Sequence, residues 1–206
     1  MNLLSIILQV SNDLINSPEA EEIKLAVYIF TERFITINKS AKKDDNFMNM
    51  IRNYMIEGKI DDAKELCKQT DTSISRMIEK GLSRIGKPLN DIQTAIENVG
   101  NLEVGKLEKG VDLIGMISGA APMLGFLGTV TGMIRAFYDM SMAGNNIDIE
   151  LLSAGIYEAM VTTVGGLFVG ILAYIFYNVL VSKIDKVVNL LESKSIEFMD
   201  VLNEPA

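Results

Sequence analysis

The chain has 206 residues with a net charge of −8, so a nucleic-acid surface, which needs clustered positive charge, is not expected. Apolar residues make up 49% of the sequence although 22% of it is charged, which indicates that the two kinds are separated along the chain. The single cysteine, Cys67, cannot form an internal disulfide. The sequence has no histidine, which is the usual general base and the commonest metal ligand, so we expect neither an enzyme nor a cofactor or metal site.

The N-terminal segment, residues 1–40, has two apolar stretches that are too short to cross a bilayer. Residues 2–12 are uncharged, and the next stretch, 25–31, is followed at once by charge. Three acids separate the two stretches: Glu19, Glu21 and Glu22. We expect an interfacial helix at 1–16 and a truncated first span, a helix over 23–37 that enters the bilayer only partly. No basic region or cleavage site of a signal peptide is seen at this end, so cleavage is not expected.

Residues 41–110 predict a polar, helical domain, with apolar side chains at helical spacing. Gly58 and Gly86 are expected to end helices, and the charges beside the apolar stripes are interpreted as solvated faces. The candidate N-caps are Asp44, Asp45, Asp61, Thr72 and Ser73. A further helix begins at Asn90, and since nothing clearly stops it before Leu113, we expect one long helix that passes from water into lipid.

Two uncharged runs are long enough to cross a membrane. They cover 22 residues from Leu113 to Ile134 and 23 residues from Ala159 to Val181. At about 1.5 Å per residue each run reaches roughly 33 Å, against roughly 30 Å for the hydrocarbon core. The sequence therefore predicts an all-α membrane protein whose parts follow one another as a transmembrane helix at 111–137, a periplasmic loop at 138–157, a transmembrane helix at 158–181 and a cytoplasmic helix at 182–206. We expect this last helix to be the preceding span running on into water.

The distribution of basic residues predicts the orientation of these helices. Fourteen lysines and arginines lie between Arg33 and Lys109, and three follow Val181. Residues 136–158 carry none. Under the positive-inside rule the 41–110 domain and the C-terminal tail are cytoplasmic and the loop lies outside.

Small residues crowd both predicted spans, which indicates helices built to approach other helices closely. The positions that we expect to pack, in GxxxG or similar spacing, are Gly125, Gly128, Gly132, Gly166 and Gly170. Because lipid gives no hydrophobic drive for association, such surfaces favour oligomers.

A few polar residues accompany these glycines. By helical spacing Thr129 shares a face with Gly125 and Gly132, and Glu158 shares one with Thr162. Such stripes suit a pore or a partner helix. From the residues alone, the alternatives stay open: threonines can bond to their own backbone, and Glu158 can be an interfacial acid at a helix start.

Two motifs resemble the MotA/TolQ/ExbB proton channel family, and ExbB in particular. They are GFLGTVTG at 125–132 and GIYEAMVTTVGG at 155–166, with shorter matches at 78–86, 96–100 and 107–110. The resemblance runs from about residue 27 to the C-terminus.

This resemblance implies a pentamer in the bacterial inner membrane that surrounds helices of an ExbD-like partner bearing an essential aspartate. The assembly would use the proton gradient to work a TonB-like protein for outer-membrane transport. Thr129, Glu158 and Thr163 match the family's pore positions, whereas spacing places Thr162, not Thr163, over Glu158. The alternatives are a TolQ-like role in envelope maintenance and a passive membrane scaffold.

Overall fold

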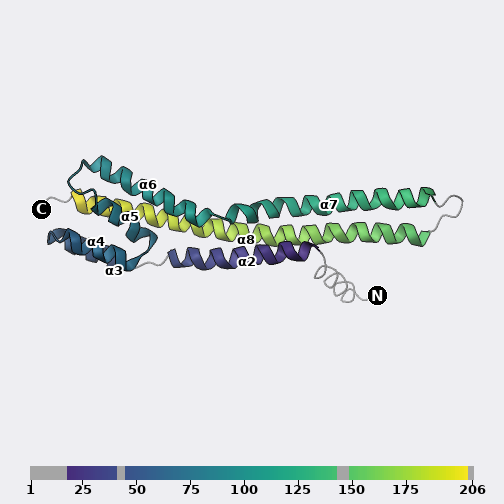
Figure 1. Ribbon diagram of the computed structural model, residues 1–206, viewed down its shortest axis with the longest axis horizontal. Coiled ribbons are helices and arrows are strands. Elements are labelled where there is room, and N and C mark those ends of the chain that lie inside the picture. Colours follow the sequence, from purple (N-terminus) through teal and green to yellow (C-terminus); the bar gives the residue numbers. More distant parts are fainter. Residues whose placement is uncertain (1–17, 41–44, 143–148, 204–206) are drawn as a thin grey trace. The chain divides into compact units, whose positions relative to one another are not determined.

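The computed structural model describes residues 18–40, 45–142 and 149–203, and within them every regular element is a helix (Figure 1). The helices are α2 (Pro18–Ser40), α3 (Asp45–Ile56), α4 (Ile60–Thr70), α5 (Ser73–Leu82), α6 (Leu89–Glu108), α7 (Val111–Met142) and α8 (Ile149–Asn203). Two of them, α7 and the part of α8 from Leu152, are long and apolar enough to cross a membrane. The predicted all-α membrane fold is therefore confirmed, while the interfacial helix expected at 1–16 lies outside the described residues.

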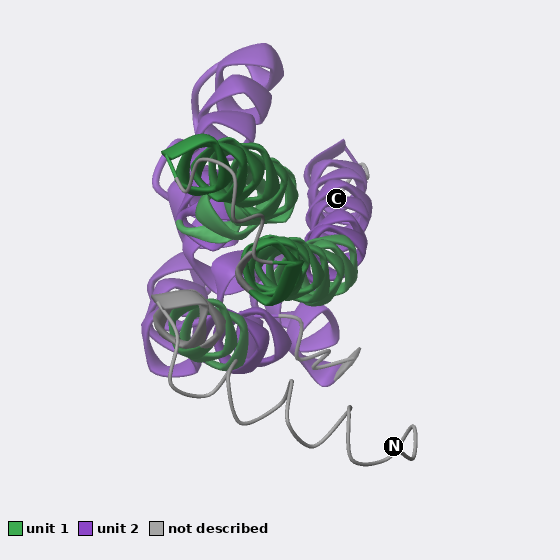
Figure 2. Cartoon of the chain, turned by 90° about the vertical axis from the view of Figure 1, so that its right-hand side faces the viewer, with its two compact units in different colours: residues 1–31, 110–179 green, residues 32–109, 180–206 purple. Residues whose placement is uncertain are grey.

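The chain divides into two compact units, which Figure 2 shows in different colours. Among the described residues, the hairpin unit consists of 18–31, 110–142 and 149–179, and the bundle unit consists of 32–40, 45–109 and 180–203. Helices α2 and α8 contribute to both units.

Helix ends in the bundle unit follow local chemistry. Thr72 is the N-cap of α5: its hydroxyl accepts from the Ser75 amide at 3.2 Å, and the Ser75 hydroxyl accepts from the Thr72 amide at 2.8 Å. The prediction that Asp61 caps α4 is wrong, because α4 begins one residue earlier and Asp61 lies in its first turn, where its charge still suits the helix dipole. Gly58 and Gly86 both have positive φ, at 72° and 91°.

The bundle unit closes around α5. Ile78 and Leu82 of this helix are buried, and Gly81 has no room for a side chain, since a Cβ there would lie 2.6 Å from the Phe198 ring of α8 and 2.8 Å from Ile96 of α6. The C-terminal half of α2 joins the same unit, with the Lys183 ammonium 4.3 Å from the centre of the Phe34 ring.

The long helix expected from Asn90 into the lipid is interrupted. Helix α6 ends at Glu108 and α7 begins at Val111, and between them Gly110 adopts a φ of 87° that a side-chain-bearing residue rarely takes. The prediction missed this break because a lone glycine inside a helical pattern is often tolerated.

The segment predicted as the loop between the two spans, 138–157, is partly helical. The residues 138–142 and 149–157 are helical, so that α7 and α8 each extend beyond their apolar runs into the segment predicted as a loop. Helix α8 has 55 residues, which corresponds to roughly 80 Å at about 1.5 Å per residue. The predicted C-terminal helix continues the last apolar helix without a break as far as Asn203, as expected. Helix α2 begins five residues before the predicted residue 23, and it is not among the candidate spans of the described chain.

One acidic side chain of the bundle unit is buried, contrary to the interpretation of its charges as solvated. Glu103 is 3% exposed. Its carboxylate accepts hydrogen bonds from Arg76 at 2.5 Å, from Lys106 at 2.5 Å and from Ser73 at 3.1 Å. Burial alone raises the pKa of this carboxyl, but the hydrogen bonds from Arg76, Lys106 and Ser73 and the Arg76 charge outweigh burial, so that its pKa falls from 4.5 to about 2. The charge network joins α5 to α6.

We expect this network to make the stability of the solubilised protein depend on acid. Because the pKa of Glu103 is lower in the folded state, its contribution is complete above about pH 5 and is lost as pH falls towards 2. A shift from 4.5 to about 2 corresponds to roughly 3 kcal/mol. Glu103→Gln should therefore lower the free energy of unfolding at pH 7 by about that amount, and the gap to the wild type should narrow at pH 3. A gap that stays constant between these pH values would show that the carboxylate charge contributes nothing.

Candidate functional site

In the hairpin unit α7 and α8 are in backbone contact, because glycines face each other across the interface. A Cβ added to Gly166 would lie 2.5 Å from the Ala121 carbonyl oxygen and 2.9 Å from the Cα of Gly125. A Cβ added to Gly125 would lie 2.9 Å from the Thr162 carbonyl oxygen. Backbone atoms cannot move aside as a side chain can, so only glycine fits at either position.

The same close approach continues towards the connection of the two helices. A Cβ at Gly128 would meet the Thr162 hydroxyl at 2.5 Å, and one at Gly132 would meet the Ala159 methyl at 2.7 Å. Gly155 of α8 stands in the same relation to the Ala136 methyl, at 2.7 Å. Glycine spacing did not predict the contacts of Ala136 and Ala159, although each alanine is a small residue four positions from a glycine of its own helix.

At the other end of the interface, Gly170 lies against the ring of Pro122. Helix α7 runs through this proline, which has no N–H to donate to the Ser118 carbonyl. A Cβ at Gly170 would also lie 3.2 Å from that carbonyl oxygen. The absence of a side chain at Gly170 thus leaves room for the proline ring within the hairpin.

A single side-chain hydrogen bond is described between the two helices of the hairpin. The Thr163 hydroxyl of α8 donates to the Gly125 carbonyl oxygen of α7 at 2.8 Å. The neighbouring Thr162 hydroxyl instead donates to its own helix, to the Ala159 carbonyl at 2.7 Å. Both threonines are half-buried and contact α7, although helical spacing turns them 100° apart.

Thr129 and Glu158 lie apart from that contact. The half-buried Thr129 donates to the Phe126 carbonyl at 2.6 Å and lies on an apolar face of α7 with Val130, Met133, Ile134, Phe137 and Tyr138. The Glu158 side chain is exposed. Within one chain the two side chains of the predicted stripe have different surroundings, since Thr162 contacts Gly128 and Glu158 is exposed.

Helix α2 packs on the hairpin from outside through aromatic rings. The rings of Phe30 and Phe176 are stacked, with 4.3 Å between their centroids. Ala26 of α2 and Val169 of α8 are buried in this unit. The polar positions of α7 and α8 are accordingly held by a three-helix unit in which the large apolar side chains of α7, such as Met123 and Phe126, remain exposed.

No group of three or more acidic or cysteine side chains that could hold a metal ion occurs within the described ranges. The polar groups beside the contact of α7 and α8 are threonine hydroxyls and backbone carbonyls, and the Glu158 carboxylate is exposed on α8. Such groups can hydrogen-bond water or a partner side chain in an otherwise apolar environment.

Comparison with known proteins gives a family match and several relatives. The model of the MotA/TolQ/ExbB proton channel family matches residues 69–193. An ExbB-like biopolymer transport protein of Synechocystis is 40% identical over 90 residues, which cover 43% of this chain and 35% of that protein. An ExbB homologue of Methanothermobacter thermautotrophicus is 30% identical over 124 residues, covering 60% and 43%. The Tol-Pal system protein TolQ of Haemophilus influenzae is 32% identical over 100 residues, covering 48% and 42%. The matched stretch thus spans less than half the length of each of these relatives.

Proposed function

Since the chain belongs to the MotA/TolQ/ExbB proton channel family, we propose that it is an ExbB-like subunit of a proton-driven motor in the bacterial inner membrane. In this proposal it assembles as a homo-pentamer around an ExbD-like single-span partner. The complex uses the proton motive force to work a TonB-like protein that energises transport across the outer membrane. The chain itself does not act as an enzyme.

The observation that carries this proposal is the hairpin of α7 and α8. Its two helices touch through glycine backbones, and its interior offers hydroxyls at Thr162 and Thr163 within an uncharged surrounding. A passive scaffold would need the glycines but not the exposed carboxylate of Glu158 at the edge of a span. We assign Thr129, Glu158 and Thr163 to the proton pathway, with Thr162 beside them.

The exposed apolar surface of the hairpin supports assembly with further helices. Met123, Phe126 and Ile134 of α7 are 74%, 65% and 64% exposed, and Met160 of α8 is 63% exposed. In a membrane such side chains face lipid or other helices. A pentamer would place part of this surface between copies and turn Glu158 and Thr129 towards the partner helix.

A TolQ-like role is the second candidate, and the similarity to the Tol-Pal protein of Haemophilus influenzae favours it. Both roles use the same hairpin, so they differ in what the partner works upon. Deletion of the gene separates them: an ExbB-like subunit is needed for energised uptake, whereas a TolQ-like subunit is needed for resistance to detergents.

Co-purification tests the shared part of the proposal. The affinity-tagged chain should retain a small single-span protein with an aspartate inside its span. If cells that produce the chain and such a partner yield the chain only as an oligomer without the partner, the passive scaffold becomes the better account.

The proposed orientation can be tested with single cysteines in a Cys67→Ala background. Cys67 cannot serve as the reporter, since it is 1% exposed and burial raises the pKa of its thiol to about 12. Ser83 of the bundle unit and Ser141 at the end of α7 are both exposed, and serine to cysteine is a nearly isosteric change. An impermeant maleimide should label Ser141→Cys in intact cells and Ser83→Cys only after the membrane is opened. The reverse pattern would invert the topology; Asn145, the other loop position suited to this test, lies outside the described residues.

A further inference from the structure

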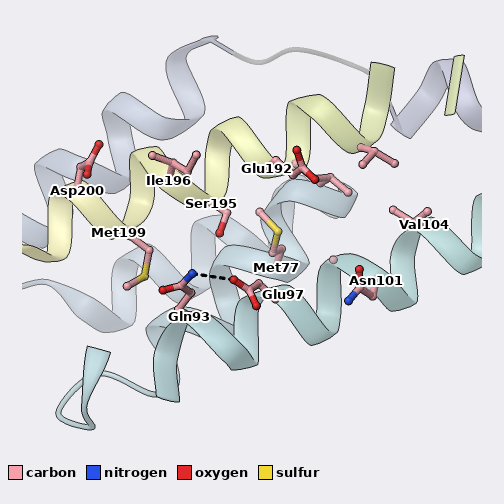
Figure 3. Close-up of a pocket in the computed structure, with 13 residues that line it drawn as sticks. Met77, Gln93, Glu97, Asn101, Val104, Glu192, Ser195, Ile196, Met199 and Asp200 are labelled. Carbon is pink, nitrogen blue, oxygen red and sulfur yellow. Dashed lines mark hydrogen bonds between the residues drawn. The ribbon is translucent and has the colours of Figure 1, made fainter. Parts of the chain in front are cut away.

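A groove runs along the bundle unit between α6 and α8 (Figure 3). Its volume is about 620 Å³. Met77 reaches into it from α5 and is buried, as is Leu191 of α8. At Gly100 the α6 wall has no side chain, and a Cβ there would make an ordinary contact of 3.5 Å with the Met77 sulfur. The bottom of the groove is therefore apolar and open to a side chain that enters from outside.

The upper walls of the groove combine apolar and acidic side chains. Ile196 of α8 is 64% exposed, and the half-buried Met199 lies one turn further along. Three exposed acids, Glu97, Glu192 and Asp200, stand on the two walls. Figure 3 shows the first on α6 and the others on α8.

The charge of this groove is unbalanced. None of the described residues that line it is a lysine or an arginine, so that its three carboxylates give it a charge of −3. Glu97 accepts a hydrogen bond from the neutral Gln93 amide at 2.8 Å. The nearby Lys194 is paired with Glu197 at 2.6 Å, and neither belongs to the groove. An occupant that complements this surface carries positive charge beside apolar side chains.

We propose that this groove binds a basic amphipathic helix, the cytoplasmic segment of the single-span partner, an inference that rests on the proposed function. A helix laid in a groove is a common mode of peptide recognition, and methionine side chains adapt to such a ligand. Under the positive-inside rule the cytoplasmic flank of a membrane span carries an excess of lysines and arginines, which is the charge that the groove would attract.

Binding to a defined probe tests the chemistry of the groove. The full chain in nanodiscs of uncharged phosphatidylcholine is titrated into a fluorescent amphipathic peptide of leucine and lysine, and anisotropy is recorded. The variant E97Q/E192Q/D200N should bind the peptide about tenfold more weakly or worse, since it loses all three charges of the groove. The control D62N/E108Q/D185N removes three exposed acids outside the groove and has the same net charge. It should bind within about twofold of the wild type. An equal loss in both variants would refute the groove as the site.

A second variant fills the groove without changing any of its charges. Gly100→Leu directs a side chain towards Met77 and should block the peptide while the acids remain. Unchanged affinity in this variant, with the fold retained by circular dichroism, would contradict the proposal.

A photo-crosslinking amino acid at Ser195, which lines the groove, identifies the natural occupant in cells that produce both proteins. A crosslink to the single-span partner supports the proposal, and a crosslink only between copies of this chain overturns it. Proton conduction by the wild-type complex separates the two levels of inference. If the wild type conducts protons but neither binds the peptide nor gives a crosslink to the partner, the groove assignment fails while the proposed function stands.

Discussion

Gly166→Ala is expected to separate α7 from α8 and to lower the free energy of unfolding of the solubilised protein by about 3 kcal/mol. The added methyl carbon would lie 2.5 Å from the Ala121 carbonyl oxygen and within 3.0 Å of the Gly125 backbone. Neither contact can be relieved by a rotamer change, so one helix must move away from the other. The Thr163–Gly125 hydrogen bond is expected to break with that movement. Unfolding in a thermal or dodecyl sulfate titration measures the change.

Gly119→Ala is the matched control for this substitution. Gly119 also lies in α7, but a Cβ there meets nothing within 4 Å. Alanine is the better helix former by about 1 kcal/mol in water, so the control should be neutral or slightly stabilising. A similar decrease in the free energy of unfolding for both substitutions would show that these glycines stabilise the protein for a reason other than the contact between the two helices.

Thr129→Leu and Thr163→Val are expected to abolish energised uptake while the oligomer still assembles. Thr129 is half-buried on an apolar face of α7, so leucine can be accommodated there, and it removes the hydroxyl proposed for the proton pathway. At Thr163 a larger residue would push against Gly125, and valine, similar in shape, removes the hydroxyl alone. Uptake rates and the size of the purified complex are measured on the same preparations.

Thr131→Leu serves as the control, because Thr131 is exposed on α7 and bonds only to carbonyls of its own helix. It should leave uptake close to the wild-type rate. At Glu158 alanine should reduce uptake more than glutamine, if the hydrogen bonds of the side chain matter more than its charge. Full uptake in Glu158→Ala would reduce this residue to an interfacial acid.

The two apolar helices could be predicted from the sequence because a bilayer imposes a minimum length on an uncharged run. Their true ends could not, since α7 and α8 continue as helices through polar residues on both sides of the connection. Helical spacing predicted the glycine positions. It could not predict which of Thr162 and Thr163 bonds to α7, because both flank the same contact and the choice depends on the side-chain rotamer.

Other features depend on residues distant in sequence. The sequence around Glu103 predicts a solvated charge, because its partner Arg76 lies 27 positions earlier and is brought beside it only by folding. The break between α6 and α7 likewise depends on the positive φ of Gly110, which the helical pattern of the surrounding residues does not predict. The acidic groove combines α6 with α8, whose residues lie about a hundred positions apart.

Proton flux into vesicles tests the central claim most directly. The chain and its single-span partner are reconstituted together in liposomes that contain a pH-sensitive dye, and a proton gradient is applied across the membrane. We predict flux that requires both proteins and that is lost when Thr163→Val is introduced here or when asparagine replaces the membrane aspartate of the partner. Gradients that decay no faster than in empty vesicles, or a flux that both substitutions leave unchanged, would contradict a proton pathway along this hairpin.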